Sequence, residues 1–96
     1  MVLGDLLARV ERADAGGHVA ALLGDLSLMT RVAVAATHEG VDADGYIMAA
    51  VRRFEREASG EEWTTLMGKV ARHDDPASAC LRYMVERVLS ASGRSA

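Results

Sequence analysis

Amphipathic helical segments account for nearly the whole of this 96-residue chain. Apolar residues recur three and four positions apart, the spacing that places them on one face of a helix. The first segment shows this spacing with Leu3, Leu6, Leu7 and Val10, and the last with Cys80, Leu81, Met84, Val85 and Val88. No segment alternates between apolar and polar residues for long enough to predict a strand. We therefore expect an all-α fold.

Residues typical of helix starts and helix ends divide the chain into five predicted helices. We expect Gly16-Gly17 and Gly40 to end helices, because glycine readily adopts the positive φ that closes a last turn. Residues 59–62 (Ser-Gly-Glu-Glu) have the form of a capping box, and Asp75-Pro76 has that of a cap followed by a first-turn proline. These signals predict helices over residues 2–14, 18–39 and 42–58, a fourth that begins at Ser59 and a fifth over about 76–90.

The second predicted helix, over residues 18–39, is the longest and contains Gly24. Glycine weakens a helix interior and Asp25 can cap a new helix, so the sequence is compatible with one long helix or with a break here. Residues 32–36 (Val-Ala-Val-Ala-Ala) are apolar on all sides, which is typical of an enclosed helix or a dimer seam. We expect a compact bundle of four to five short helices with a central apolar helix 2.

Length and composition predict one helical domain over residues 1–92, followed by a frayed tail over residues 93–96. Half of the residues are hydrophobic but only 4% are aromatic, so the core must consist mainly of Leu, Val, Met and Ala. Alanine buries little apolar area, and apolar area drives folding. We therefore expect a second copy of the chain to complete the core of a homodimer.

Charge and cysteine content favour a cytoplasmic protein. The net charge of −3 gives no electrostatic reason to bind nucleic acid or an anionic membrane. Cys80 is the only cysteine, and the chain begins without the basic region of a signal peptide. The most apolar window, residues 19–36, contains Asp25 and Arg31, which argues against a membrane span. The usage of Ala, Arg and Val is typical of bacterial proteins.

The sequence contains no Gly-rich phosphate loop, no metal-ligand cluster and no nucleophile with a nearby base. Residues 40–47 resemble part of a calcium loop but lack its bidentate carboxylate, so we interpret Asp42 or Asp44 as a helix cap. His38 and His73 are the best candidates for an enzyme site, which would form only across a dimer. We expect a protein that is not an enzyme and that has no cofactor or metal.

Residues 31–56 carry the main alternative, a DNA-binding regulator of the helix-turn-helix type. Ala36, Gly40 and Val41 have the spacing of a helix end, a turn glycine and a buried valine in that motif. This pattern is short, and other corners between two helices share it.

Three arginines, Arg52, Arg53 and Arg56, are candidate interaction residues. In the DNA-binding alternative they contact phosphates. Glu55 and Glu57 lie among them, however, and such a mixture of charges is typical of a solvated helix face with ion pairs four residues apart. Nucleic acid is therefore the less favoured partner.

Trp63 is the fourth candidate interaction residue. It is either an aromatic contact for a protein partner or an anchor in the core, since Met67 follows it at helical spacing. We expect a small non-catalytic cytoplasmic protein, either an interaction module or a regulatory or accessory subunit, that acts as a homodimer.

Overall fold

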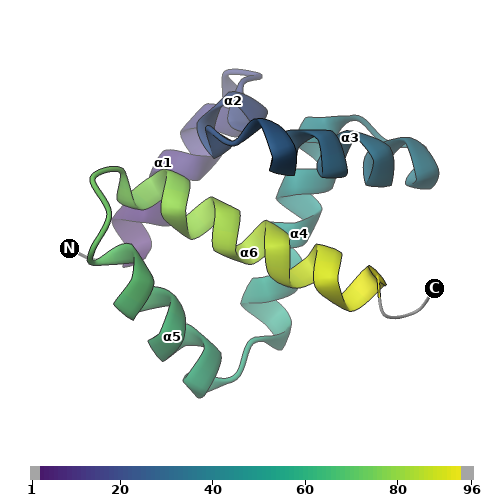
Figure 1. The fold of residues 1–96 in the computed structure, drawn as a ribbon. Helices are drawn as coiled ribbons and strands as arrows, with labels where there is room; N and C mark the ends of the chain where they lie inside the picture. Colours follow the sequence, from purple (N-terminus) through teal and green to yellow (C-terminus); the bar gives the residue numbers. More distant parts are fainter. Residues whose placement is uncertain (1–2, 94–96) are drawn as a thin grey trace.

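α-Helices form all of the regular structure in residues 3–93, the part of the chain that this computed structural model describes. In chain order the six helices are α1 (Leu3–Ala15), α2 (Val19–Leu23), α3 (Leu26–Glu39), α4 (Ala43–Glu57), α5 (Gly60–Val70) and α6 (Pro76–Gly93) (Figure 1). The all-α prediction is confirmed. The helix count exceeds the predicted four to five because the expected second helix is divided into α2 and α3.

The break between α2 and α3 lies at Gly24 and has a local cause. Gly24 has φ +65°, a left-handed conformation in which a Cβ atom would crowd the backbone. The next residue, Asp25, is extended, and its carboxylate accepts a hydrogen bond from the Leu28 amide at 3.0 Å. One residue thus ends α2, and its neighbour caps the start of α3.

Side chains of α6 satisfy the carbonyl groups at the end of α2. The Ser78 hydroxyl donates to the Leu22 carbonyl oxygen, and Arg82 Nη1 donates to the Leu23 carbonyl oxygen at 3.0 Å. The last carbonyls of a helix have no partner within it, and a buried one without a donor is costly. These two bonds fix the end of α2 against α6.

α6 passes through the middle of the molecule and contacts each of the other five helices (Figure 1). Residues 77–81 (Ala-Ser-Ala-Cys-Leu) are all buried, as are Met84 and Val85 one turn further on. This arrangement differs from the prediction of a central helix 2. In α3, Val34 is 67% exposed, because only the side that carries Leu28, Val32 and Ala36 packs inward.

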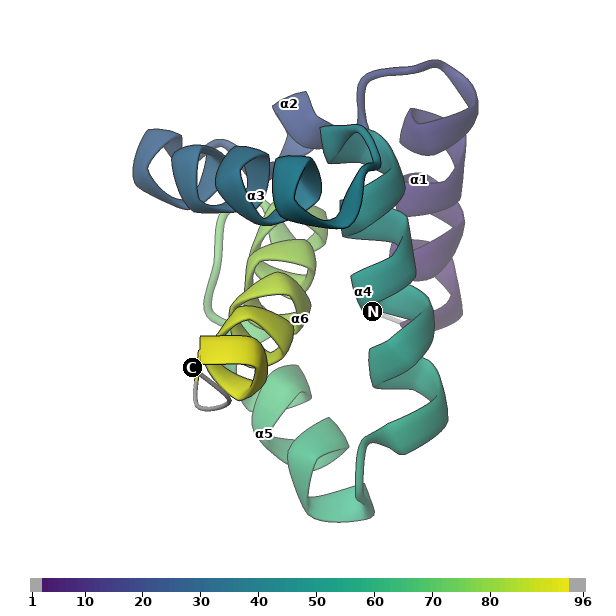
Figure 2. The ribbon, with the colours of Figure 1, turned by 90° about the vertical axis from the view of Figure 1, so that its right-hand side faces the viewer.

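The predicted helix start at Asp42 and helix end at Gly40 are present in the structure. Gly40 has φ +72°, and the Val41 amide donates to the Ala36 carbonyl oxygen at 3.0 Å, which closes the last turn of α3. The Asp42 carboxylate caps α4 by accepting from the Gly45 amide at 2.7 Å. This short connection turns the chain sharply, and α3 lies across the beginning of α4 (Figure 2).

The predicted capping box at the start of α5 is formed only in half. The Ser59 hydroxyl accepts a hydrogen bond from the Glu62 amide at 3.1 Å, as expected. The Glu62 carboxylate instead pairs with Arg87 of α6, at 2.8 Å from Nη2. Glu62 therefore ties α5 to α6, where the capping box predicted a bond back to Ser59.

All six helices contribute to one hydrophobic core, which the single chain closes by itself. The radius of gyration is 12.6 Å, close to the value of about 12.5 Å expected for a compact domain of this length. The buried side chains of the helices before α4 are Leu6, Val10, Ala13, Val19, Leu23, Leu28, Val32 and Ala36. Any dimer must therefore use an outer surface.

The end of α6 lies slightly beyond the predicted boundary. The helix continues to Gly93, and the rest of the predicted tail, residues 94–96, lies outside the described residues. Within residues 3–93 no helix combines the length and hydropathy that a membrane span requires.

Replacement of Gly24 tests the break between α2 and α3. Because an L-residue is strained at φ +65°, we expect Gly24→Ala to lower the free energy of unfolding by about 1–2 kcal/mol. Gly68→Ala is the matched control, since Gly68 lies inside α5 and an added Cβ there meets nothing within 4 Å. It should raise the free energy of unfolding by about 0.5–1 kcal/mol. Urea unfolding followed by circular dichroism measures both, and equal effects would contradict the assignment of the break to Gly24.

Candidate functional site

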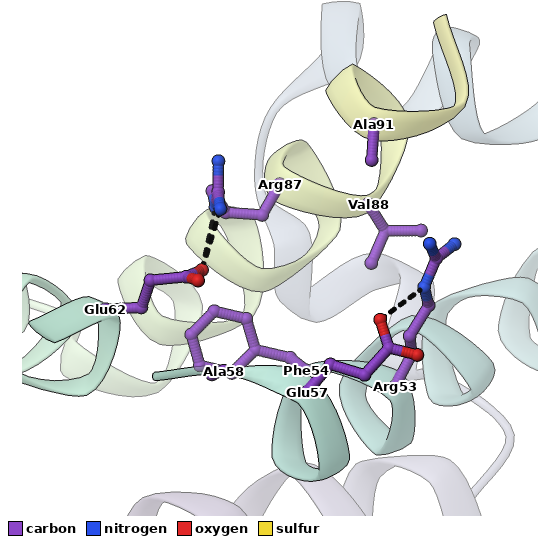
Figure 3. A pocket seen from close by; sticks show the side chains of 8 residues that line it. All are labelled: Arg53, Phe54, Glu57, Ala58, Glu62, Arg87, Val88 and Ala91. Atoms are coloured by element: carbon purple, nitrogen blue, oxygen red, sulfur yellow. Dashed lines mark hydrogen bonds and ion pairs between the residues drawn. The ribbon is translucent and has the colours of Figure 1, made fainter. Parts of the chain in front are cut away.

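A small pocket lies where the end of α4 and the start of α5 meet the second half of α6 (Figure 3). Its volume is about 130 Å³. Its lining residues are Arg53, Phe54, Glu57, Ala58, Glu62, Arg87, Val88 and Ala91. Sites for cofactors and drug-sized ligands occupy about 300–1,000 Å³, so this pocket holds at most a few waters or a small ion.

Two ion pairs flank the apolar floor of this pocket. Arg87 contacts the Glu62 carboxylate through Nη2 at 2.8 Å, and Arg53 Nε lies 3.2 Å from Glu57 Oε1, with Phe54 between the pairs (Figure 3). The hydrogen bond that Arg87 donates to the Glu62 carboxylate, and then the negative charge of that carboxylate, raise the pKa of Arg87. Both carboxylates are engaged, and no lining residue is a nucleophile. The pocket therefore has the chemistry of a joint between helices rather than that of an active site.

Trp63 lies beside the core, half-buried. Its ring meets Phe54 edge to face, with centroids 4.9 Å apart, and Phe54 meets Tyr83 in the same way at 5.8 Å. Such pairs stabilise a fold beyond the area they bury. Of the two roles left open by the sequence, these contacts favour an anchor over an aromatic contact for a partner.

Arg52, Arg53 and Arg56 lie on the exposed side of α4, the side opposite its core residues. Arg53 is paired with Glu57, whereas the other two make no ion pair within the described residues. The three arginines share a surface with the carboxylates at 55 and 57, which are also exposed. The structure thus places the predicted arginines together, on a face of mixed charge.

The corner between α3 and α4 differs in detail from a helix-turn-helix. Val41, which that motif would bury, is 46% exposed. Asp42 and Asp44 lie at the start of α4, where a recognition helix approaches DNA. Asp44 Oδ1 accepts a hydrogen bond from the Ala20 amide at 3.1 Å and so caps α2 as well. Both carboxylates are used to hold helices in place.

The two candidate histidines, His38 and His73, lie at different turns of the chain. His38 is in the last turn of α3, whereas His73 lies between α5 and α6, and these turns are on opposite sides of the molecule in Figure 1. Within residues 3–93, no group of three or more His, Cys, Asp or Glu side chains is arranged to hold a metal ion. The convergence that an enzyme site would need within one chain is not found.

Cys80 is completely buried in the second turn of α6. Burial, and to a lesser extent the negative charge of Glu55, raise the pKa of the thiol from 9.0 to about 11. A thiol in this state is protonated and unreactive at neutral pH. Cys80 is therefore a small residue of the core, on the apolar side of α6.

The outer face of α3 overlaps residues 32–36, for which the sequence left open an enclosed helix or a dimer seam. We define it by its exposed residues Leu26, Ser27, Thr30, Ala33, Val34 and Thr37. Leu26 is 82% exposed, and no residue of the set carries a charge. The Thr30 and Thr37 hydroxyls donate to backbone carbonyls four residues earlier, so each has its hydrogen bond within the helix. The sequence indicates this face through its low charge, because Arg31 is the only charged residue in residues 26–37.

Comparison of the chain with protein-family models, with curated proteins and with solved structures found no match. The function must therefore be argued from the surfaces and groups described above.

The raised pKa of Cys80 makes the free energy of unfolding depend on pH in alkaline solution. In the unfolded chain the thiol ionises near pH 9, whereas in the fold it stays protonated to about pH 11. Its contribution to stability is therefore fully present below pH 9 and decreases as the pH rises to about 11. Between pH 9 and about pH 11 we expect ionisation of Cys80 in the unfolded chain to lower the free energy of unfolding by roughly 2–3 kcal/mol.

Urea unfolding of the wild type and of Cys80→Ala at a series of alkaline pH values measures this effect. The difference in unfolding free energy between the two proteins should decrease steadily from pH 9 upward. A difference that stays constant would show that the thiol ionises equally well in both states.

Proposed function

We propose that this chain is a non-catalytic interaction module that forms a homodimer through the outer face of α3. The observation that carries the proposal is the scarcity of charge on an exposed helix face that includes a large apolar residue, Leu26, and whose one charged neighbour, Arg31, is paired with Glu86. Exposed helix faces in soluble proteins are normally charged or polar, and exposed apolar patches commonly mark interaction surfaces.

Comparison with α4 within the same molecule makes the contrast clear. The exposed side of α4 carries Arg52, Arg53, Glu55, Arg56 and Glu57. α3 has a similar length, yet its exposed residues between 26 and 37 include only one charged group, Arg31, whose Nη1 lies 3.9 Å from Glu86 Oε1. Desolvating the α3 face on association therefore involves one charge that already has a partner, whereas desolvating the α4 face would bury several.

A second copy of the chain fits this face because its features are complementary to each other. Ala33, Val34 and Thr37, together with His38, line a shallow hollow that is open to solvent. Leu26 projects from the same face, two to three turns away along the helix. In an antiparallel pair of α3 helices, Leu26 of each copy lies against the hollow of the other. This is the self-complementary arrangement that a two-fold axis requires.

The position of the two-fold axis follows from the same geometry. The midpoint between Leu26 and Val34 is residue 30, so the axis passes near Thr30. The small residues Ser27, Thr30 and Ala33 allow two helix axes to approach closely. Like-charge repulsion between copies of net charge −3 is kept away from this contact, because the face itself is uncharged.

The size of the face predicts a reversible dimer. A helix of 14 residues is about 21 Å long, and one face of it covers less than the roughly 800 Å² per partner of a standard interface. We therefore expect dissociation on dilution. We place the module in the cytoplasm, since a lone buried cysteine is typical of a reducing compartment.

We do not propose DNA binding through residues 31–56. The carboxylates of Asp42 and Asp44 at the start of α4 would meet phosphates, and Arg53 is already paired with Glu57. Binding to DNA requires a surface of clustered positive charge, and this surface is mixed.

A charge placed in the outer face of α3 tests the proposal. Light scattering after size exclusion should show that the mass of the wild type rises from monomer toward dimer as the concentration increases. Val34→Lys should remain monomeric, because dimerisation would bury two unpaired ammonium groups. Its own fold should be unaffected, since Val34 is 67% exposed and lysine is a good helix former.

The matched control is Ala49→Lys, which adds the same charge to the exposed side of α4. It should dimerise like the wild type. A wild type that stays monomeric at every concentration, or a control that is as monomeric as Val34→Lys, would contradict dimerisation through α3.

A further inference from the structure

A groove between α1 and α2 gathers basic side chains over an apolar wall. Its volume is about 510 Å³, within the range of sites that bind small molecules. Its lining residues are Arg9, Arg12, Ala13, His18, Ala21 and Leu22. The sequence alone left His18 isolated, but the reversal of the chain at Gly16-Gly17 brings it next to the two arginines of α1.

Two of the three basic side chains are held in place by neighbouring groups. Arg9 Nη1 lies 3.5 Å from Asp75 Oδ1, at the start of α6. His18 Nδ1 lies 3.0 Å from the Gly16 carbonyl oxygen, and a Cβ added at Gly16 would clash with the imidazole ring. The ring therefore packs closely over the backbone of the turn. Arg9 and His18 are both exposed, so their side chains can reach a ligand in the groove.

Arg12 is the arginine of the groove whose charge is not balanced by a neighbouring carboxylate. Its side chain makes no ion pair and no hydrogen bond within the described residues, and it lies one turn from Arg9 on the same side of α1. Like charges at this spacing destabilise a helix slightly. In a concave surface they also concentrate positive potential, although the chain as a whole is acidic.

The chemistry of the groove selects its ligand. Guanidinium groups bind oxyanions through parallel hydrogen bonds, so Arg12, with Arg9 beside it in an exposed ion pair to Asp75, can bind a doubly charged phosphate monoester more strongly than a singly charged carboxylate. Ala13, Ala21 and Leu22 supply an apolar wall for a hydrocarbon group. We propose that this groove binds a phosphate monoester that carries a short apolar substituent. The proposal is independent of dimerisation through α3.

Calorimetric titration with octyl phosphate tests the assignment, with inorganic phosphate and octanoate as comparison ligands. Octyl phosphate should bind at least about tenfold more tightly than either, because each comparison ligand lacks one half of the recognised chemistry. Octanoate that binds as tightly as octyl phosphate would overturn the choice of phosphate. Inorganic phosphate that binds as tightly would overturn the role of the apolar wall.

Two variants locate the binding in the groove. Arg12→Gln should weaken octyl phosphate binding about tenfold through loss of a charged hydrogen-bond donor, and Ala21→Glu should abolish it by placing a negative charge on the wall. Arg56→Gln is the matched control, an exposed arginine of α4 without an ion pair, and it should bind like the wild type. Equal losses in Arg12→Gln and Arg56→Gln would show that binding follows net charge alone, which would overturn the proposal.

Discussion

The hydrogen bonds from Ser78 and Arg82 to the end of α2 are the interactions on which the rest of this structure depends. They join the first half of α6 to the Leu22 and Leu23 carbonyl oxygens, more than fifty residues earlier in the chain. The carbonyls that α2 leaves open at its end are thereby satisfied inside the protein, where water would otherwise be needed. With α2 stopped at this point, Gly24 can reverse the backbone and Asp25 can begin α3 in a new direction.

The path of α3 follows from this break, and the proposed function follows from that path. α3 packs on α4 and α6 through Leu28, Val32 and Ala36, which leaves its opposite side to solvent. A continuous helix over residues 18–39 would have had no reason to take this direction. The uncharged outer face is therefore a consequence of how α6 fixes α2, and it provides a surface on which a second copy can dock without any disturbance of the core.

Interactions between residues close together in the chain made the helices predictable. The central helix could not be predicted from such interactions. Gly40, Ser59 and Asp42 act within a few residues of themselves, so their roles could be read from the sequence. Residues 32–36 and residues 77–81 are both mostly small and apolar, and only the second run is enclosed. The difference comes from Ser78 and Arg82, whose partners lie far away in the chain. The basic groove was missed for the same reason, because Arg9, Arg12 and His18 meet only after the turn between α1 and α2 has formed.

Disulfide cross-linking of Thr30→Cys tests the central claim most directly, that two α3 helices pair about an axis near this residue. The native Cys80 is buried and does not compete for the reaction. Thr30→Cys should form a covalent dimer rapidly under mild oxidation, and Ala49→Cys, on the exposed side of α4, should form one only slowly. Equal rates for the two variants would contradict the pairing of α3 with α3, and with it the function proposed for this chain.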